Sequence, residues 1–291
     1  MSANRLLLLR AVTTRLRQIP GAVIAMEPLR KRFGQRRSTL VVNDFDGDLK
    51  FELDLDGHMG SQIFWYGSYS RHELRLLDRI VKPGMTVMDV GANAGEVTLF
   101  VAKRVGPTGR VFSFEPLDVM ADRLTLNVAM NHLDQVEVVR MGLSDADGEV
   151  PIYSAAEAFH DGTHHEGLGT IYPGGPRTKE LQRIQLTTAD KWAASRDLDR
   201  VDVMKIDVEG AELPVIHGAL GLVETHRPWL FLEVQELTAS NASYTAGDVL
   251  DALTPFGYRF YRIQRDPMPE VTRDTLQAFQ NVVAVPAGKA L

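Results

Sequence analysis

Short apolar runs alternate with longer amphipathic stretches through most of this chain of 291 residues. The runs have the length and composition of buried strands, and the stretches between them have helical spacing. Buried strands joined by crossover helices predict an α/β fold with a mostly parallel sheet and helices on both faces. The predicted strands are 86–90, 111–114, 136–140, 201–206 and 230–234, and the predicted helices are 96–104, 119–131, 211–224 and 246–254.

Two further apolar runs, 258–263 and 281–285, have no strong helix between them. They predict an antiparallel pair that closes one edge, which makes a Rossmann-like, seven-stranded sheet. Residues 145–186 interrupt the alternation and are rich in Gly, His and Thr. We expect an inserted hairpin and long loop there, acting as a lid over the substrate.

The first 65 residues differ from the rest, and we expect residues 1–65 to cap a single domain of residues 66–291. A basic helical segment comes first, followed by two alternating runs around Asp46-Gly47-Asp48, which predict a β-hairpin. The helical segment is too short and too often interrupted by arginine to span a membrane. We expect it to pack on its own domain or on a partner subunit more than to lie on a membrane surface, so a homodimer through this segment is an open alternative.

The net charge and the absence of cysteine argue against several classes of function. The net charge of −6 argues against a duplex nucleic-acid binder, which normally carries a basic face. The chain has no cysteine, which excludes disulfides and thiolate metal sites and favours a reducing, cytoplasmic setting.

The segment Asp89-Val-Gly-Ala-Asn-Ala-Gly95 joins a predicted strand to a predicted helix. Gly91 and Gly95 allow a ligand to approach the backbone closely, with Asn93 between them. The spacing differs from the Gly-x-Gly-x-x-Gly of dinucleotide sites. Asp89 is placed to face the ammonium group of an amino-acid-bearing sulfonium, or a bridging water. We therefore expect S-adenosylmethionine as the cofactor.

Polar residues also end the second and third predicted strands. Glu115 follows the last glycine of the turn by about 20 residues, the distance at which an acid accepts hydrogen bonds from ribose hydroxyls. Ser144 and Asp145 end the third strand, where a hydroxyl and an acid can bind the adenine amine. These residues indicate an adenosine-containing ligand.

Three acids follow the fourth and fifth predicted strands, which in open α/β sheets is where ligands bind. We expect Asp207 or Glu209 to be the base that removes a proton from the acceptor, and Glu233 to orient the acceptor. The alternative for Glu209, as for Glu212, is that it only caps the following helix.

Histidines cluster in the long loop, together with Asp161 and Glu166. Imidazole and carboxylate suit divalent ions, but histidine-rich surface loops without a metal are commoner, so we expect no metal site. The histidines are His160, His164 and His165.

Three blocks in the right order resemble the FkbM family of methyltransferases: Asp89-Val-Gly-Ala-Asn-Ala-Gly95, Phe114-Glu-Pro116 and Lys205-Ile-Asp-Val-Glu-Gly-Ala-Glu212. The resemblance covers residues 66–234. It implies the class I methyltransferase fold, S-adenosylmethionine and, commonly, O-methylation of sugars or natural-product hydroxyls. Gln235 stands where many members have a histidine, and a glutamine cannot take a proton from the acceptor.

The main interpretation is an enzyme that methylates a hydroxyl of a sugar or other small molecule, without a nucleic-acid partner. An RNA or protein methyltransferase is a second reading, and a NAD-dependent oxidoreductase is a third. A fourth is a non-catalytic module that binds S-adenosylmethionine. Substitution of Asp207 by Asn separates an enzyme from a binding module, since only the enzyme has turnover to lose.

Overall fold

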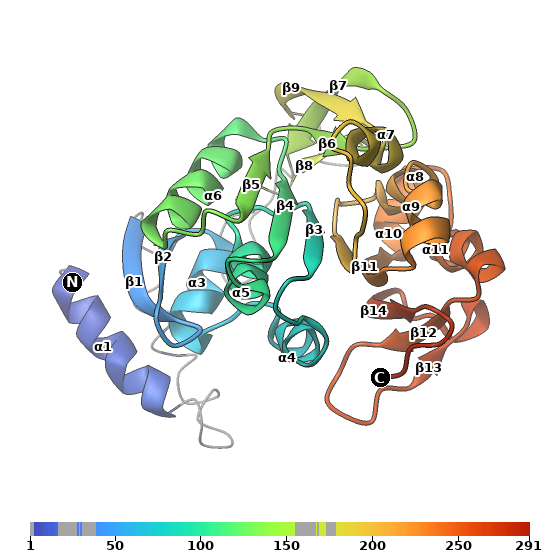
Figure 1. The fold of residues 1–291 in the computed structure, drawn as a ribbon. Helices are drawn as coiled ribbons and strands as arrows, with labels where there is room; N and C mark the ends of the chain where they lie inside the picture. Colours follow the sequence, from blue (N-terminus) through green and yellow to red (C-terminus); the bar gives the residue numbers. More distant parts are fainter. Residues whose placement is uncertain are drawn as a thin grey trace.

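A central β-sheet with helices on both faces forms the body of the molecule (Figure 1). The computed structural model describes residues 3–16, 28, 30, 39–154, 167, 169–172 and 179–291. In spatial order the strands of the sheet are β13 (Glu270–Val271), β12 (Arg259–Arg262), β14 (Phe279–Val285), β11 (Trp229–Gln235), β10 (Val203–Ile206), β3 (Thr86–Val90), β4 (Arg110–Phe114) and β5 (Val136–Val139).

The strands from β5 to β11 run parallel, and β14 is antiparallel to both β11 and β12. The prediction of a Rossmann-like, mostly parallel sheet with an antiparallel edge is confirmed. Within the described residues the sheet has eight strands, one more than predicted, because β13 adds a short edge beside β12. A run of two residues is too short to show a strand pattern in the sequence.

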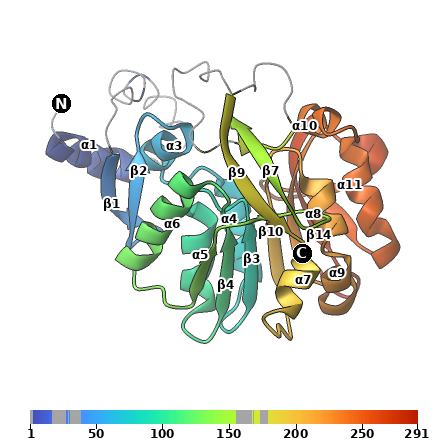
Figure 2. The ribbon, with the colours of Figure 1, turned by 90° about the horizontal axis from the view of Figure 1, so that it is seen from above.

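Helices cover the two faces of the sheet in separate groups (Figure 2). One face carries α4 (Arg71–Ile80), α5 (Glu96–Val105) and α6 (Asp118–Met130), and the other carries α8 (Glu212–His217), α9 (Leu220–His226) and α11 (Ala246–Leu253). The shorter helical elements are α3 (His58–Tyr66), α7 (Ala189–Ala194), α10 (Glu236–Asn241), η1 (Thr254–Phe256) and η2 (Arg273–Thr275).

Successive side chains along a strand point to opposite faces of the sheet, so neighbouring residues belong to different hydrophobic cores. Val87 and Val203 belong to the core on the α5 side, whereas Met88 and Met204 belong to the core on the α8 side. All four are at least 99% buried, so the central strands are apolar on both faces, as expected of a doubly covered parallel sheet.

The predicted helix 211–224 is two helices, α8 and α9, separated near Gly218. A Cβ atom at Gly218 would lie 1.9 Å from the carbonyl oxygen of Ser144. This close approach of two backbones breaks the helix, and helical periodicity alone does not reveal it.

A smaller sheet lies where the sequence predicts the insertion. Its strands are in the order β6 (Gly142–Leu143), β9 (Lys179–Thr187), β7 (Gly148–Ser154) and β8 (Gly169–Thr170), with β7 and β9 forming an antiparallel pair. Ile152, Ile184 and Leu186 pack with Leu117 and Met120 next to α6. Much of the predicted lid, including His160, His164 and His165, lies outside the described residues.

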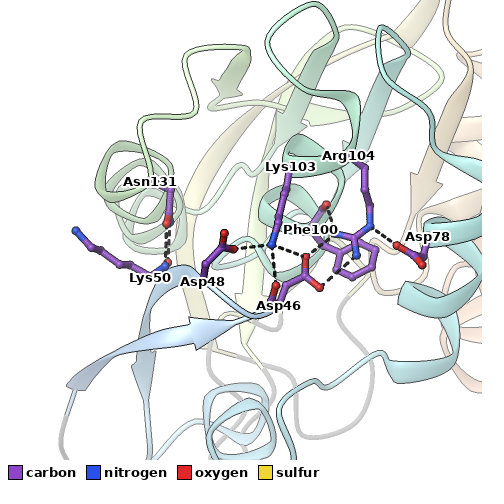
Figure 3. Close-up of polar contacts among 8 residues, drawn as sticks. All are labelled: Asp46, Asp48, Lys50, Asp78, Phe100, Lys103, Arg104 and Asn131. Carbon is purple, nitrogen blue, oxygen red and sulfur yellow. Dashed lines mark hydrogen bonds and ion pairs between the residues drawn. The ribbon is translucent and has the colours of Figure 1, made fainter.

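A β-hairpin precedes the main sheet and is joined to it by ion pairs. Strands β1 (Thr39–Phe45) and β2 (Leu49–Asp54) pair antiparallel around the turn at Asp46. Arg104 of α5 donates to Asp46 over 2.6 Å and to Asp78 over 2.7 Å. Figure 3 shows these contacts, and Lys103 reaching the carbonyl of Asp46 and the carboxylate of Asp48. The hairpin is therefore attached to the face of α5.

Helix α1 (Ala3–Leu16) contacts the molecule through a buried arginine. Arg10 donates to the carbonyl of Ile63 over 2.9 Å and pairs with Asp44 over 2.8 Å. No helix among the described residues is long and apolar enough to cross a membrane. The division at residue 65 and the homodimer through this segment stay predictions.

Candidate active site

A cavity of about 170 Å³ opens at the carboxyl ends of β3, β4, β10 and β11. Side chains of both signs line it, with carboxylates in excess. Of the residues singled out from the sequence, Gly91, Asn93, Glu115, Asp207, Glu209 and Glu233 belong to its wall. The structure therefore brings these six residues together around one space.

The glycine turn forms one side of this cavity. Gly91 has a φ of 79°, and a Cβ atom there would lie 1.9 Å from the carbonyl oxygen of Asp207. A Cβ atom at Gly95, whose φ is 102°, would lie 2.5 Å from Leu124. Asn93 has a φ of 51°, and asparagine tolerates this region better than most residues. Both glycines are required by the shape of the turn.

Glu115 holds the same turn in place. Its carboxylate accepts hydrogen bonds from the backbone N–H of Asn93 over 2.8 Å and of Leu117 over 2.9 Å. Burial raises the pKa of Glu115 to about 7, although both hydrogen bonds act in the opposite direction. A carboxylate oxygen has two lone pairs, so Glu115 can still accept a hydrogen bond from a ligand hydroxyl in the cavity.

Asp89 lies beneath the cavity and is not among its lining residues. The side chain is fully buried, and one oxygen accepts a hydrogen bond from the hydroxyl of Thr98 over 2.7 Å. The other oxygen has no hydrogen-bond partner among the described residues and lies 3.7 Å from Nζ of Lys205. Burial raises the pKa of Asp89, while Lys205 and Thr98 oppose that rise. The expected contact between Asp89 and a ligand ammonium stays a prediction.

Lys205 connects the turn to the acids of the neighbouring strand. Its Nζ donates to the carbonyl of Gly91 over 3.2 Å and lies 3.2 Å from a carboxylate oxygen of Asp207. Burial alone would lower the pKa of Lys205, but the carboxylates of Asp207, Asp89 and Glu73 outweigh it and raise the pKa. Lys205 is therefore a buried cation at the centre of the site.

Asp207, Glu209 and Glu233 converge at the mouth of the cavity. One carboxylate oxygen from each lies within 4.8 Å of the others. Strands β10 and β11 are neighbours, which explains why acids that follow them meet. Burial, followed by the charges of Asp207 and Glu209, raises the pKa of Glu233 to about 10. This shift favours the protonated form of the Glu233 carboxyl.

Glu212 has a structural role that differs from that of Glu209. Its carboxylate accepts hydrogen bonds from the backbone N–H of Val208 over 3.0 Å and of Gly210 over 3.1 Å. The hydroxyl of Tyr244 donates to it over 3.2 Å. Glu212 thus fixes the loop after β10, whereas the side chain of Glu209 lines the cavity. The capping interpretation fits Glu212, and for Glu209 it stays a prediction.

Ser144 and Asp145 lie further from the cavity than expected. Among the described residues its wall includes Met141, Gly142 and Leu143 but neither of these two. The hydroxyl of Ser144 donates to the carboxylate of Asp145 over 3.2 Å. Their contact with an adenine amine stays a prediction.

Glu96 and Glu73 are two acids near the site that the sequence pattern does not predict to be there. Glu96 is buried and lines the cavity, and it accepts hydrogen bonds from the backbone N–H of Tyr69 over 2.5 Å and of Ser70 over 3.0 Å. Glu73 lies on α4, and burial raises its pKa to about 8. Glu96 directly follows Gly95, where an acid normally indicates only the start of a helix.

The lining residues fit a nucleoside-bearing ligand. Gly91 and Glu115 line the cavity, and the carboxylate of Glu115 offers an acceptor for ribose hydroxyls. Apolar side chains suited to a flat base complete this side of the cavity, namely Phe114, Leu117, Leu143, Ile152 and Leu186. Within the described residues the only group of acids or histidines spaced to hold a metal ion is Asp207, Glu209 and Glu233.

The methyltransferase FkbM domain matches residues 89–260, which is more than half of the chain and includes the end of β3 and all of β4, β10 and β11. The chain belongs to the FkbM family. It has the class I methyltransferase fold, in which β3, β4 and β5 lie on one side of β10 and the antiparallel edge lies on the other.

The chain is similar in sequence to three proteins of different length. AMB antimetabolite synthetase AmbE of Pseudomonas aeruginosa is 28% identical over 72% of this chain, which spans 11% of AmbE. Methyltransferase sdnD of Sordaria araneosa is 29% identical over 45% of this chain and 59% of its own length. The 2-O-methyltransferase NoeI of Sinorhizobium fredii is 24% identical over 62% of this chain and 76% of its own length. The chain thus spans less than two thirds of the first two relatives.

Proposed function

We propose that this FkbM methyltransferase uses S-adenosylmethionine to methylate a hydroxyl of a sugar or natural-product small molecule. The observation that carries the proposal is the convergence of Asp207, Glu209 and Glu233 at the mouth of a cavity whose side is the glycine turn. A cofactor side and an acid-lined acceptor side thus share one space. The 2-O-methyltransferase NoeI, whose printed name specifies an oxygen acceptor, supports this reading.

The cofactor side is formed by the glycine turn and Glu115. Gly91 and Asn93 line this side of the cavity, and Glu115 accepts hydrogen bonds from ribose hydroxyls. Asp89 acts from beneath by fixing Lys205 and Thr98. When bound, S-adenosylmethionine supplies an electrophilic methyl group on a sulfonium.

The acceptor side aligns a hydroxyl with that methyl group. A bound S-adenosylmethionine would give its methyl group to the acceptor oxygen, and its sulfur would keep the electron pair of the broken sulfur–methyl bond. The acceptor's proton passes to Asp207 or Glu209. The raised pKa of Glu233 favours its protonated form, which can donate a hydrogen bond that orients the acceptor.

Isothermal titration of the purified protein tests the cofactor. We expect saturable binding of S-adenosylmethionine and none of NADH, whose dinucleotide turn is absent from the sequence. Release of S-adenosylhomocysteine with a hydroxylated acceptor would then establish O-methylation. Absence of binding at millimolar S-adenosylmethionine would overturn the proposal. A labelled methyl group retained on bulk RNA or protein would favour a macromolecular acceptor instead.

A further inference from the structure

One face of the antiparallel pair β11 and β14 changes from apolar to polar towards the cavity. Residues directly opposite in this pair project to the same face. The register pairs Phe231 with Val283, Glu233 with Asn281, and Gln235 with Phe279. Phe231 and Val283 are completely buried, whereas the next two pairs are partly exposed or exposed. The apolar face thus becomes polar where the cavity opens, and it stays accessible beyond it.

The polar side chains on this face have no hydrogen-bond or ion-pair partner among the described residues. Glu233, Gln235 and Asn281 are each partly buried. No hydrogen bond or ion pair joins their side-chain atoms to any described residue. Polar groups in such positions normally have a partner, and a ligand or ordered water supplies it when the protein does not. These three side chains therefore form a row of unused donors and acceptors that starts at the cavity wall.

An aromatic ring ends the row. Phe279 is 53% exposed although it lies in a strand. Its side chain follows Asn281 on the same face and lies opposite Gln235. Amide groups bind hydroxyls as donors and as acceptors, and an aromatic ring packs against the C–H face of a saturated ring. A ligand with hydroxyls along its edge and one apolar face matches both features.

We propose that Gln235, Asn281 and Phe279 form the outer part of the acceptor site, and that it binds a neutral, hydroxylated saturated ring such as a pyranose. The inference rests on the proposed function, because it places the ring beyond Glu233 with one hydroxyl at the three acids. Those acids lie within 4.8 Å of one another, so a carboxylate on the acceptor would be repelled. A neutral ring is thus preferred to a uronate.

Saturation-transfer NMR tests the site on the full chain loaded with S-adenosylhomocysteine. The probes are methyl α-glucopyranoside, methyl α-glucuronoside and phenol. We expect transfer to the C–H protons of the neutral glycoside and at least fivefold less to the glucuronoside. Phe279→Ser and Asn281→Ala should each reduce transfer to the neutral glycoside at least threefold. Leu126→Ser, which changes an exposed apolar residue of α6 (43% exposed), should leave it unchanged.

Several results would overturn the proposal. They are equal transfer in the Phe279 variant and the wild type, stronger transfer to phenol than to the glycoside, and no transfer to either glycoside. Calorimetric affinity for S-adenosylhomocysteine distinguishes this failure from failure of the proposed function. Unchanged affinity with no effect of the two substitutions removes the outer site alone, whereas absence of cofactor binding removes both.

Discussion

Nζ of Lys205 lies 3.2 Å from a carboxylate oxygen of Asp207 and 3.7 Å from one of Asp89. The first acid lines the cavity and the second lies beneath it. Lys205 also donates to the carbonyl of Gly91. One buried ammonium therefore joins the cofactor turn to the acids of the acceptor side, and changes at Lys205 should affect both.

Replacement of Lys205 by Met should strongly destabilise the fold. Asp89 is fully buried and would lose the cation that opposes the rise of its pKa. Removal of one partner of a buried pair costs about 3–5 kcal/mol in the free energy of unfolding. Urea unfolding of the variant measures this loss. The matched control is Lys103→Met, which breaks pairs at a lysine whose side chain is 36% exposed and should cost about 1 kcal/mol or less. Equal losses in the two variants would contradict the central role of Lys205.

Replacement of Gly91 by Ala should weaken cofactor binding. The new Cβ atom would lie 1.9 Å from the carbonyl oxygen of Asp207, so the turn or β10 must move. We expect an affinity for S-adenosylmethionine at least about tenfold weaker, equivalent to about 1.4 kcal/mol. Gly47→Ala is the control, since Gly47 has a similar positive φ of 98° but no atom within 4 Å of the added Cβ. If both variants bind the cofactor like the wild type, the close approach at Gly91 is unimportant.

The stability of the protein should fall as pH rises above neutrality. Burial raises the pKa of Glu73 to about 8, well above its unfolded value. The protonated form is therefore favoured by folding. This contribution is fully present below the unfolded pKa and is lost as pH rises through about 8. Glu73→Gln has no proton to lose, so its free energy of unfolding should fall by about 1.4 kcal/mol less than that of the wild type between pH 7 and pH 9.

Chemical denaturation at several pH values measures the effect of Glu73. Glu224→Gln, at an exposed position of α9, should follow the wild type and serves as the control. Parallel pH profiles for wild type and Glu73→Gln would show that the carboxyl of Glu73 does not take up its proton on folding.

Substitutions at Asp207 and Glu233 should separate the two roles proposed for these acids. Asp207→Asn removes a proton acceptor, so we expect kcat to fall about 10²–10⁴-fold if Asp207 is the base, with little change in cofactor affinity. Glu233→Gln keeps a hydrogen-bond donor and should cost less. Initial rates with a working acceptor, together with titration of S-adenosylmethionine, measure both effects. A larger loss of kcat in Glu233→Gln than in Asp207→Asn would indicate that Glu233 is the base and that Asp207 orients the acceptor.

The sequence predicts the fold better than it predicts the detail of the site. Strand and helix alternation places the central sheet correctly because its strands are buried on both faces and read as continuous apolar runs. The same logic places Asp207 and Glu233 at neighbouring strand ends. Glu96 and Glu73 are missed, because their closeness to the site depends on how α4 packs on α5.

Single-residue details of the site depend on tertiary contacts that no local pattern contains. Asp89 ends a strand next to the cavity, yet its side chain turns towards Thr98 and Lys205 beneath the wall. Glu209 and Glu212 look alike in the sequence, but Glu212 accepts hydrogen bonds from the loop and from Tyr244, whereas Glu209 is among the residues that line the cavity. The break between α8 and α9 follows from the carbonyl of Ser144, which comes from a distant part of the chain.

The attachment of the β1–β2 hairpin determines how the gene can be shortened. Phe45, Phe51 and Trp65 are at least 99% buried in the core that also contains Val87 and Leu99. A chain cut to residues 66–291 would leave that apolar surface open to water and would remove the partner carboxylates of Lys103 and Arg104. Such a fragment is expected to precipitate when expressed, whereas one that begins at residue 39 keeps the hairpin and its contacts with α5.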